Sequence, residues 1–155
     1  MDTQVITAFA RAGIETFRTM CRLEVAPKQA KVKGDRTPGE GIHAIIGMNG
    51  AVEGACALSV VESTAFALIE RMTGHYPESV DRDVIEGIQE IDNVIIGLAR
   101  RNLQGSGLDF VFGLPKTMSG ILFSTDEGPQ YENLGIIFDT EVGRVLMGLH
   151  WKLGG

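Results

Sequence analysis

Two polar side chains, three residues apart, are the pair in this sequence best placed to do chemistry together. Glu90 and Asn93 lie within residues 83–103, DVIEGIQEIDNVIIGLARRNL. Residues three apart are neighbours on the surface of an α-helix, so this carboxylate and this amide could act jointly on one small target. Glu86 and Gly97 fall on the same side of the helix. Gly97 leaves a gap in the side-chain surface where another backbone could approach.

The helix that would hold this pair is predicted by its apolar periodicity. At about 100° per residue, one broad face collects Val84, Ile88, Ile91, Val94, Ile95 and Leu98. We expect that face in the core and the Glu90–Asn93 face outside. Asp81 or Asp83 is expected to cap the helix, and Asp83 with Glu86 resembles a capping box, which gives Glu86 a competing structural role. Periodicity alone also fits an ordinary surface helix.

The remaining segments predict an α+β fold, with helices packed on one face of a mostly antiparallel sheet. A first helix is expected over residues 4–22, followed by a lysine-rich edge strand. A hairpin is expected over residues 42–61, with Asn49-Gly50 in a type I′ turn. A second helix is expected over residues 63–73, capped by Ser63 or Thr64 and ended by Gly74. Strands are expected at 111–115, 118–124 and 134–139, with a turn at 126–129, and the final run 144–153 alternates apolar and other residues.

Composition limits the classes of protein that this chain can be. Its 155 residues suit one domain, 1–155, and its net charge of −6 argues against nucleic acid as the main partner. No apolar run approaches the roughly 18 residues of a membrane span, and the start lacks a secretory signal. Cys21 and Cys56 are interpreted as small core residues in a reducing compartment, so we expect a cytoplasmic protein. The three histidines lie apart, without metal-ligand spacing.

A family resemblance rests on the same helix. The stretch E-I-D-N-V-I-I-G, followed by Pro115 after 21 intervening residues, resembles the CheC/CheX/FliY phosphatases of bacterial chemotaxis. Their signature is an acidic residue or Ser, then Glu-x-x-Asn, then Pro about 22 positions later, and Glu90, Asn93 and Pro115 match it in type and spacing. The single copy of the motif and the chain length resemble the CheX branch. Glu86 is a departure, because the family tends to have Asp or Ser there.

The resemblance implies a CheX-like fold and dephosphorylation of a phosphoaspartate on a CheY-like response-regulator receiver. Glu90 and Asn93 would be catalytic: Asn93 would orient the attacking water, much as a glutamine does in GTPases, and Glu90 would pair with the receiver's lysine. Glu86, Gly97 and Pro115 would contact the partner. The chain would need no cofactor of its own, because the receiver carries the Mg²⁺.

Other interpretations of the same residues stay open. The alternative is a non-catalytic module that binds a receiver, related to flagellar switch components, in which the same surface only docks. A third is a structural domain with no partner at this helix. A homodimer through strand edges is also expected, because the resemblance implies one and because the long last strand has an edge that must be paired or protected.

Overall fold

Helices and strands follow one another in the order that the sequence predicts. The computed structural model describes residues 2–30, 41–119 and 132–154. The helices are α1 (Asp2–Cys21), α2 (Glu62–Thr73) and α3 (Arg82–Asn102). The strands are β1 (Ala26–Ala30), β2 (Ile42–Gly50), β3 (Val52–Val60), β4 (Phe110–Phe112), β5 (Lys116–Ser119), β6 (Glu132–Thr140) and β7 (Gly143–Leu153). The predicted turn at 126–129 and most of the predicted strand 118–124 lie outside the described residues.

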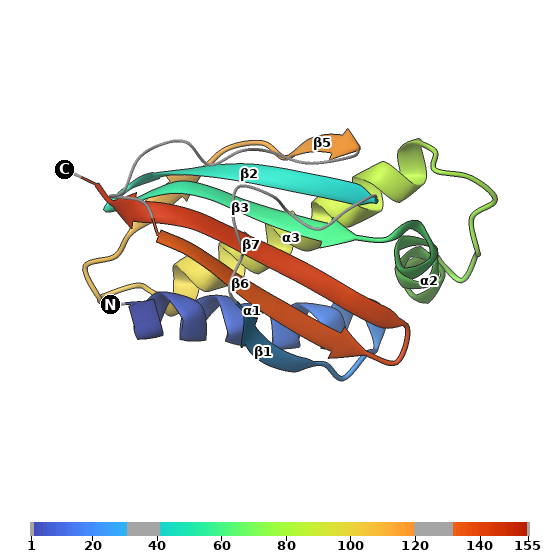
Figure 1. Cartoon of the computed structure of the whole chain (residues 1–155), viewed down its shortest axis with the longest axis horizontal. Coiled ribbons are helices and arrows are strands. Elements are labelled where there is room, and N and C mark those ends of the chain that lie inside the picture. The colour runs from blue at the N-terminus through green and yellow to red at the C-terminus, as the bar shows by residue number, and fades with distance from the viewer. Residues whose placement is uncertain (1, 31–40, 120–131, 155) are drawn as a thin grey trace.

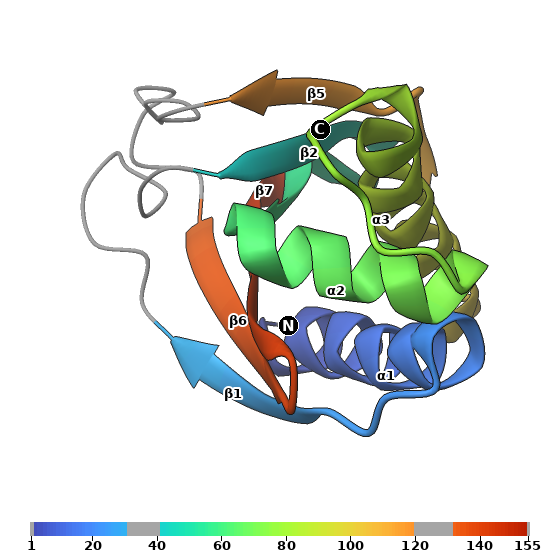
Figure 2. The ribbon, with the colours of Figure 1, turned by 90° about the vertical axis from the view of Figure 1, so that its right-hand side faces the viewer.

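The strands form one antiparallel sheet with the helices on one side of it. The strand order is β1-β6-β7-β3-β2-β4, and β5 pairs with β2 beyond β4 along the same edge. Helices α1 and α3 lie behind the sheet in Figure 1, and α1 runs beside α3. Figure 2, seen along the strands, shows all three helices gathered on one side. The α+β prediction, with helices on one face, is confirmed.

The buried faces of the elements explain this layering. In β7, Val145, Met147, Leu149 and Trp151 are buried, as the alternating pattern predicts, whereas Leu153 at the strand's end is 48% exposed. On α1, Phe17 packs against Phe138 of β6, with ring centroids 5.5 Å apart. Apolar side chains from the helices and from the inner face of the sheet therefore make one shared core.

The hairpin of β2 and β3 forms, but not with the turn that was predicted. The register pairs Met48 with Gly54, so more than two residues connect the strands. Asn49 and Gly50 continue β2, where they pair with Val111 and Phe110 of β4. Among the described residues, Arg22 is the one non-glycine with positive φ, so Asn49 cannot be in a type I′ turn. The type I′ prediction is wrong because a third strand captures these residues.

Two further expectations are corrected by the fold. Strand β7 lies between β3 and β6, so the last strand has no free edge, and that argument for a dimer is lost. Helix α2 starts at Glu62, so Ser63 and Thr64 lie inside it, and the N-cap residue, Val61, has no side-chain oxygen to cap it. The Thr64 hydroxyl donates to the carbonyl of Val142. Gly74 ends α2 in the left-handed conformation, at φ 81°, as predicted.

Both cysteines are buried and free, as the sequence predicts. Burial raises the pKa of the Cys21 thiol to about 11, so it stays protonated. No helix among the described residues is long and apolar enough to cross a membrane.

Candidate functional site

Helix α3 carries the site, and its first turn fixes where the site begins. The Asp81 carboxylate accepts a hydrogen bond from the Val84 amide at 3.1 Å, which makes Asp81 the N-cap. Asp83 therefore belongs to the first turn, and its predicted capping box with Glu86 is not formed. Glu86 is exposed and instead makes an i,i+4 ion pair with Arg82 at 3.8 Å, which stabilises the helix only weakly.

The buried face of α3 is displaced around the helix from the predicted one. The buried residues are Val84, Ile88, Ile91, Asp92, Ile95, Ile96 and Ala99. Val94 and Leu98, which were assigned to the core, are only half-buried. The displacement arises because α3 packs against α1 as well as against the sheet, so a second flank of the helix is covered.

Glu90 and Asn93 lie outside this buried face, as predicted. Glu90 is exposed and Asn93 is half-buried. Asn93 is the less accessible of the two because it lies on the flank nearer to Ile96, by the helical wheel. Within the part of the chain that the structure describes, neither side chain has a hydrogen bond or an ion pair. The carboxylate and the amide are thus both available to a second molecule.

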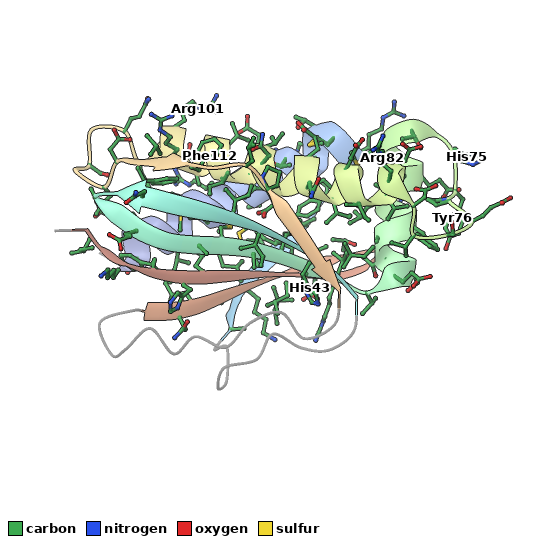
Figure 3. The ribbon with its side chains drawn as sticks, turned by 90° about the horizontal axis from the view of Figure 1, so that it is seen from above. His43, His75, Tyr76, Arg82, Arg101 and Phe112 are labelled. Carbon is green, nitrogen blue, oxygen red and sulfur yellow. The ribbon has the colours of Figure 1, made fainter. Side chains whose placement is uncertain are left out.

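Gly97 lies on the flank of α3 that faces Phe112 of β4, and Pro115 lies in the connection between β4 and β5. A Cβ placed on Gly97 would come within 3.7 Å of the Phe112 ring, which is an ordinary contact. Phe112 is drawn beside α3 in Figure 3. Its ring gives Gly97 a packing role within the chain, in addition to the proposed close approach of a partner.

Residues 113–115 connect β4 to β5 and include Pro115. The chain runs from β4 to β5 in the direction opposite to α3 (Figure 1). Phe112, before this connection, lies near Gly97, and β5, after it, contacts α3. Leu114 is 86% exposed and Pro115 is half-buried. Sequence reasoning overlooked Leu114.

Asp92 is the most unexpected residue of α3. It is completely buried, and its one hydrogen-bond partner is the Cys56 thiol of β3, which donates to Oδ1 at 3.5 Å. Its other oxygen, Oδ2, has no hydrogen-bond partner among the described residues. Burial raises the pKa of the carboxyl well above its usual range, against a smaller lowering by the Cys56 hydrogen bond. The only sequence signal was its i+4 spacing from Ile88.

Two of the three histidines make side-chain contacts within the sheet, away from α3. His43 Nδ1 lies 2.8 Å from the Ser59 hydroxyl, and His150 Nδ1 lies 2.7 Å from the Asn133 side-chain oxygen. Among the residues described by the structure, no three His, Cys, Asp or Glu side chains are grouped so that they could hold a metal ion. The chemistry of the α3 surface thus rests on an amide and carboxylates.

Solved structures similar to this chain share its fold. A CheC-like superfamily protein from Shewanella sp. PV-4 has a TM-score of 0.86 at 23% identity, over 98% of this chain and 99% of that chain. The chemotaxis protein CheX from Vibrio vulnificus has a TM-score of 0.84 at 24% identity, over 96% and 99%. CheX of Borrelia burgdorferi, solved with CheY, BeF3 and Mg²⁺, has a TM-score of 0.71 at 19% identity, over 95% and 97%. No curated protein matches the chain.

The sequence itself matches one protein family. Chemotaxis phosphatase CheX matches over residues 42–139, more than half of the chain, a range that includes the whole of α3 and the β4–β5 connection. Glu90, Asn93 and Pro115 therefore all lie within the range that matches the family. The chain belongs to the CheX family of chemotaxis phosphatases.

Proposed function

We propose that this protein is a cytoplasmic phosphatase that hydrolyses the phosphoaspartate of a CheY-like response-regulator receiver. The observation that carries the proposal is the Glu90–Asn93 pair, which lies one turn of α3 apart, outside the core and without partners in the described chain. Family membership and the existence of a CheX–CheY complex in a relative of the same fold support a receiver as the partner.

In this proposal, Asn93 holds the attacking water. An amide can accept one hydrogen bond from the water and donate another to it, which orients the water without a general base. The water oxygen forms a new bond to phosphorus while the bond from phosphorus to the aspartate oxygen breaks. The aspartate leaves as a carboxylate, and the protons of the water end on the released phosphate and in solvent. Mg²⁺ on the receiver would neutralise the negative charge on the phosphoryl oxygens.

Glu90 fixes the register of the complex. Its exposed carboxylate can form a charge-assisted hydrogen bond with the lysine of the receiver, which sets where α3 lies over the phosphoryl group. The surface around this pair contacts the receiver through Glu86, Gly97 and Pro115. The alternative is a module that only docks on the receiver. The Glu90–Asn93 pair favours the enzyme, because a docking surface has no particular need for an amide at residue 93.

The test uses the full chain with purified receivers from the same genome. Each receiver is charged with acetyl phosphate in the presence of Mg²⁺, the excess is removed, and phosphate release is followed with and without this protein. We expect accelerated release from at least one receiver, at a rate proportional to the amount of phosphatase added. Binding to phosphorylated receivers without any acceleration over spontaneous decay would replace the enzyme with the docking module.

A further inference from the structure

Among the residues that the structure describes, Asp92 and Cys56 form a polar contact between α3 and the sheet. Cys56 is completely buried in β3, a strand with a neighbour on each side, β2 and β7. Asp92 is completely buried on α3, one residue before Asn93. The α3 residues that flank it in the core, Ile88, Ile91, Ile95, Ile96 and Ala99, are apolar. The thiol–carboxyl bond is therefore a directional contact within an apolar interface.

The chemistry of the site keeps Asp92 uncharged. An ionised carboxylate buried without a cationic partner is costly, so such a group takes up a proton instead. Cys56 is the ionisable side chain that acts on Asp92 among the described residues, and its own pKa is raised by burial and by Asp92. The pair therefore consists of a neutral acid and a neutral thiol that share a hydrogen bond.

A directional bond at this place constrains the rotation of α3. Apolar contacts tolerate small shifts of a helix over a sheet, because the hydrophobic effect has no preferred direction. A hydrogen bond weakens steeply when its angle changes. Asp92 and Asn93 are adjacent and project about 100° apart on the helix, so the angle at which Asp92 meets Cys56 sets the angle at which Asn93 leaves the surface.

We propose that Asp92 is a positioning residue: its hydrogen bond to Cys56 locks the rotation of α3 on β3 and thereby holds Asn93 at the half-buried angle needed to orient the water. The inference rests on the proposed phosphatase activity. Asp92 itself is buried and touches neither the receiver nor the phosphoryl group, so its effect passes entirely through Asn93.

The experiment compares three substitutions and one control in the full-length chain. Asp92→Ala and Cys56→Ala each remove one partner of the bond, whereas Asp92→Asn keeps a neutral polar group of the same shape. Ile95→Val, a loss of one methylene from the same buried face of α3, controls for loosened packing. Urea unfolding, kcat and KM on a phosphorylated receiver are measured for each. The NMR signal of the Asn93 side-chain amide is recorded without any receiver.

We expect Asp92→Ala and Cys56→Ala to fold cooperatively, with KM close to that of the wild type and kcat lower by roughly tenfold or more, since small misplacements of a reacting group are costly. Asp92→Asn should restore kcat to near the wild-type value, and Ile95→Val should leave it unchanged. Cys56→Ala, on a different element from Asn93, should shift the Asn93 amide signal. If Asp92→Ala does not fold, Cys56→Ala carries the test alone.

The inference would be overturned by wild-type kcat with an unmoved Asn93 signal in Cys56→Ala, or by a loss of kcat in Asp92→Asn as large as in Asp92→Ala. Ile95→Val losing as much kcat as Cys56→Ala would overturn it also, because any loosening would then suffice. A wild-type protein that is inactive on every receiver would refute the proposed function, whereas the Asn93 signal would still report whether the pair holds the helix.

Discussion

Glu90 and Asn93 differ in exposure, and that difference assigns them different tasks in the proposed reaction. Glu90→Ala should weaken the complex and slow hydrolysis together, because the ion pair with the receiver's lysine sets the register. Asn93→Ala should leave most of the binding but lower the single-turnover rate by about 10²–10³, by analogy with the loss of one preorganised polar group. Affinity for a receiver carrying a phosphoryl mimic, measured beside single-turnover hydrolysis, separates the two effects.

An exposed acid on another helix serves as the control for these substitutions. Glu70 is exposed on α2, and Glu70→Ala should change neither binding to the receiver nor the rate of hydrolysis. Because Glu90 and Asn93 have no partners in the described chain, neither Ala variant should lower the free energy of unfolding appreciably. Normal hydrolysis by Asn93→Ala would remove the assigned role of the amide.

Asp92 makes the stability of the protein depend on pH in a predictable direction. Burial raises the pKa of its carboxyl above the ordinary value of 3.8, so the folded chain keeps a proton that the unfolded chain loses. The stability due to this group is complete below that value and is lost as the pH rises from there through the raised pKa. Asp92→Asn cannot ionise, so its free energy of unfolding relative to the wild type should increase with pH over this range.

Urea unfolding of both proteins, from about pH 4 into the alkaline range, measures this difference directly. Other carboxylates titrate in both proteins alike, so their contributions cancel in the comparison. A difference that stays constant over the whole range would mean that Asp92 ionises in the folded chain as easily as in the unfolded one.

Among the elements, the contact between α1 and β6 depends on the absence of one side chain. A Cβ at Gly13 would overlap the ring of Phe138, which is fully buried and packed against Phe17. Helix propensity favours Ala over Gly by about 1 kcal/mol. Overpacking of a rigid core typically costs more, about 1–3 kcal/mol. Gly13→Ala should therefore lower the free energy of unfolding, by up to about 2 kcal/mol.

Gly97→Ala is the matched substitution for Gly13→Ala, on another helix. Its Cβ would make only an ordinary contact with Phe112, at 3.7 Å. The higher helix propensity of Ala over Gly should therefore decide the effect on stability. We expect Gly97→Ala to raise the free energy of unfolding by up to about 1 kcal/mol. Equal effects of the two substitutions in thermal or urea unfolding would show that α1 is free to move away from β6.

The elements show why the sequence predicted the motif better than its surroundings. The outward position of Glu90 and Asn93 follows from helical periodicity alone, which is a local property. The burial of Asp92 depends on how α3 lies against β3, and the strand conformation of Asn49 depends on pairing with β4. Both are contacts between segments distant in sequence, which a local pattern does not encode. The role of Phe112 beside Gly97 is hidden for the same reason.

For the whole molecule, the question is which surface remains for a second copy. The described sheet has free edges at β1 and along β4 and β5, at opposite sides in Figure 1. The β4–β5 edge lies beside α3, because Phe112 lies near Gly97 and β5 contacts α3. Pairing there would compete with a receiver. If the expected homodimer forms through a strand edge, the β1 edge leaves both motifs open.

Strand β1 shows which of its backbone groups point outward. Pro27 lacks an N–H, so it fits in β1 only where that group would face away from β6. Gln29 is two residues further on, so its N–H points to the same outer side. Lys28 lies between them and opposes indiscriminate strand addition, so the two copies must pair in a register that does not bring the lysines face to face.

These positions give a substitution that tests the dimer without disturbing the β1–β6 ladder. Gln29→Pro removes an outward N–H, whereas Gln29→Ala keeps it. We expect the wild type and Gln29→Ala to sediment at micromolar concentration with twice the 16.7 kDa mass of one chain. Gln29→Pro should sediment as a single chain and keep its activity per motif, because the motif lies at the far side of the sheet. A monomeric wild type would refute the dimer, and a dimeric Gln29→Pro would show that the copies associate through another surface.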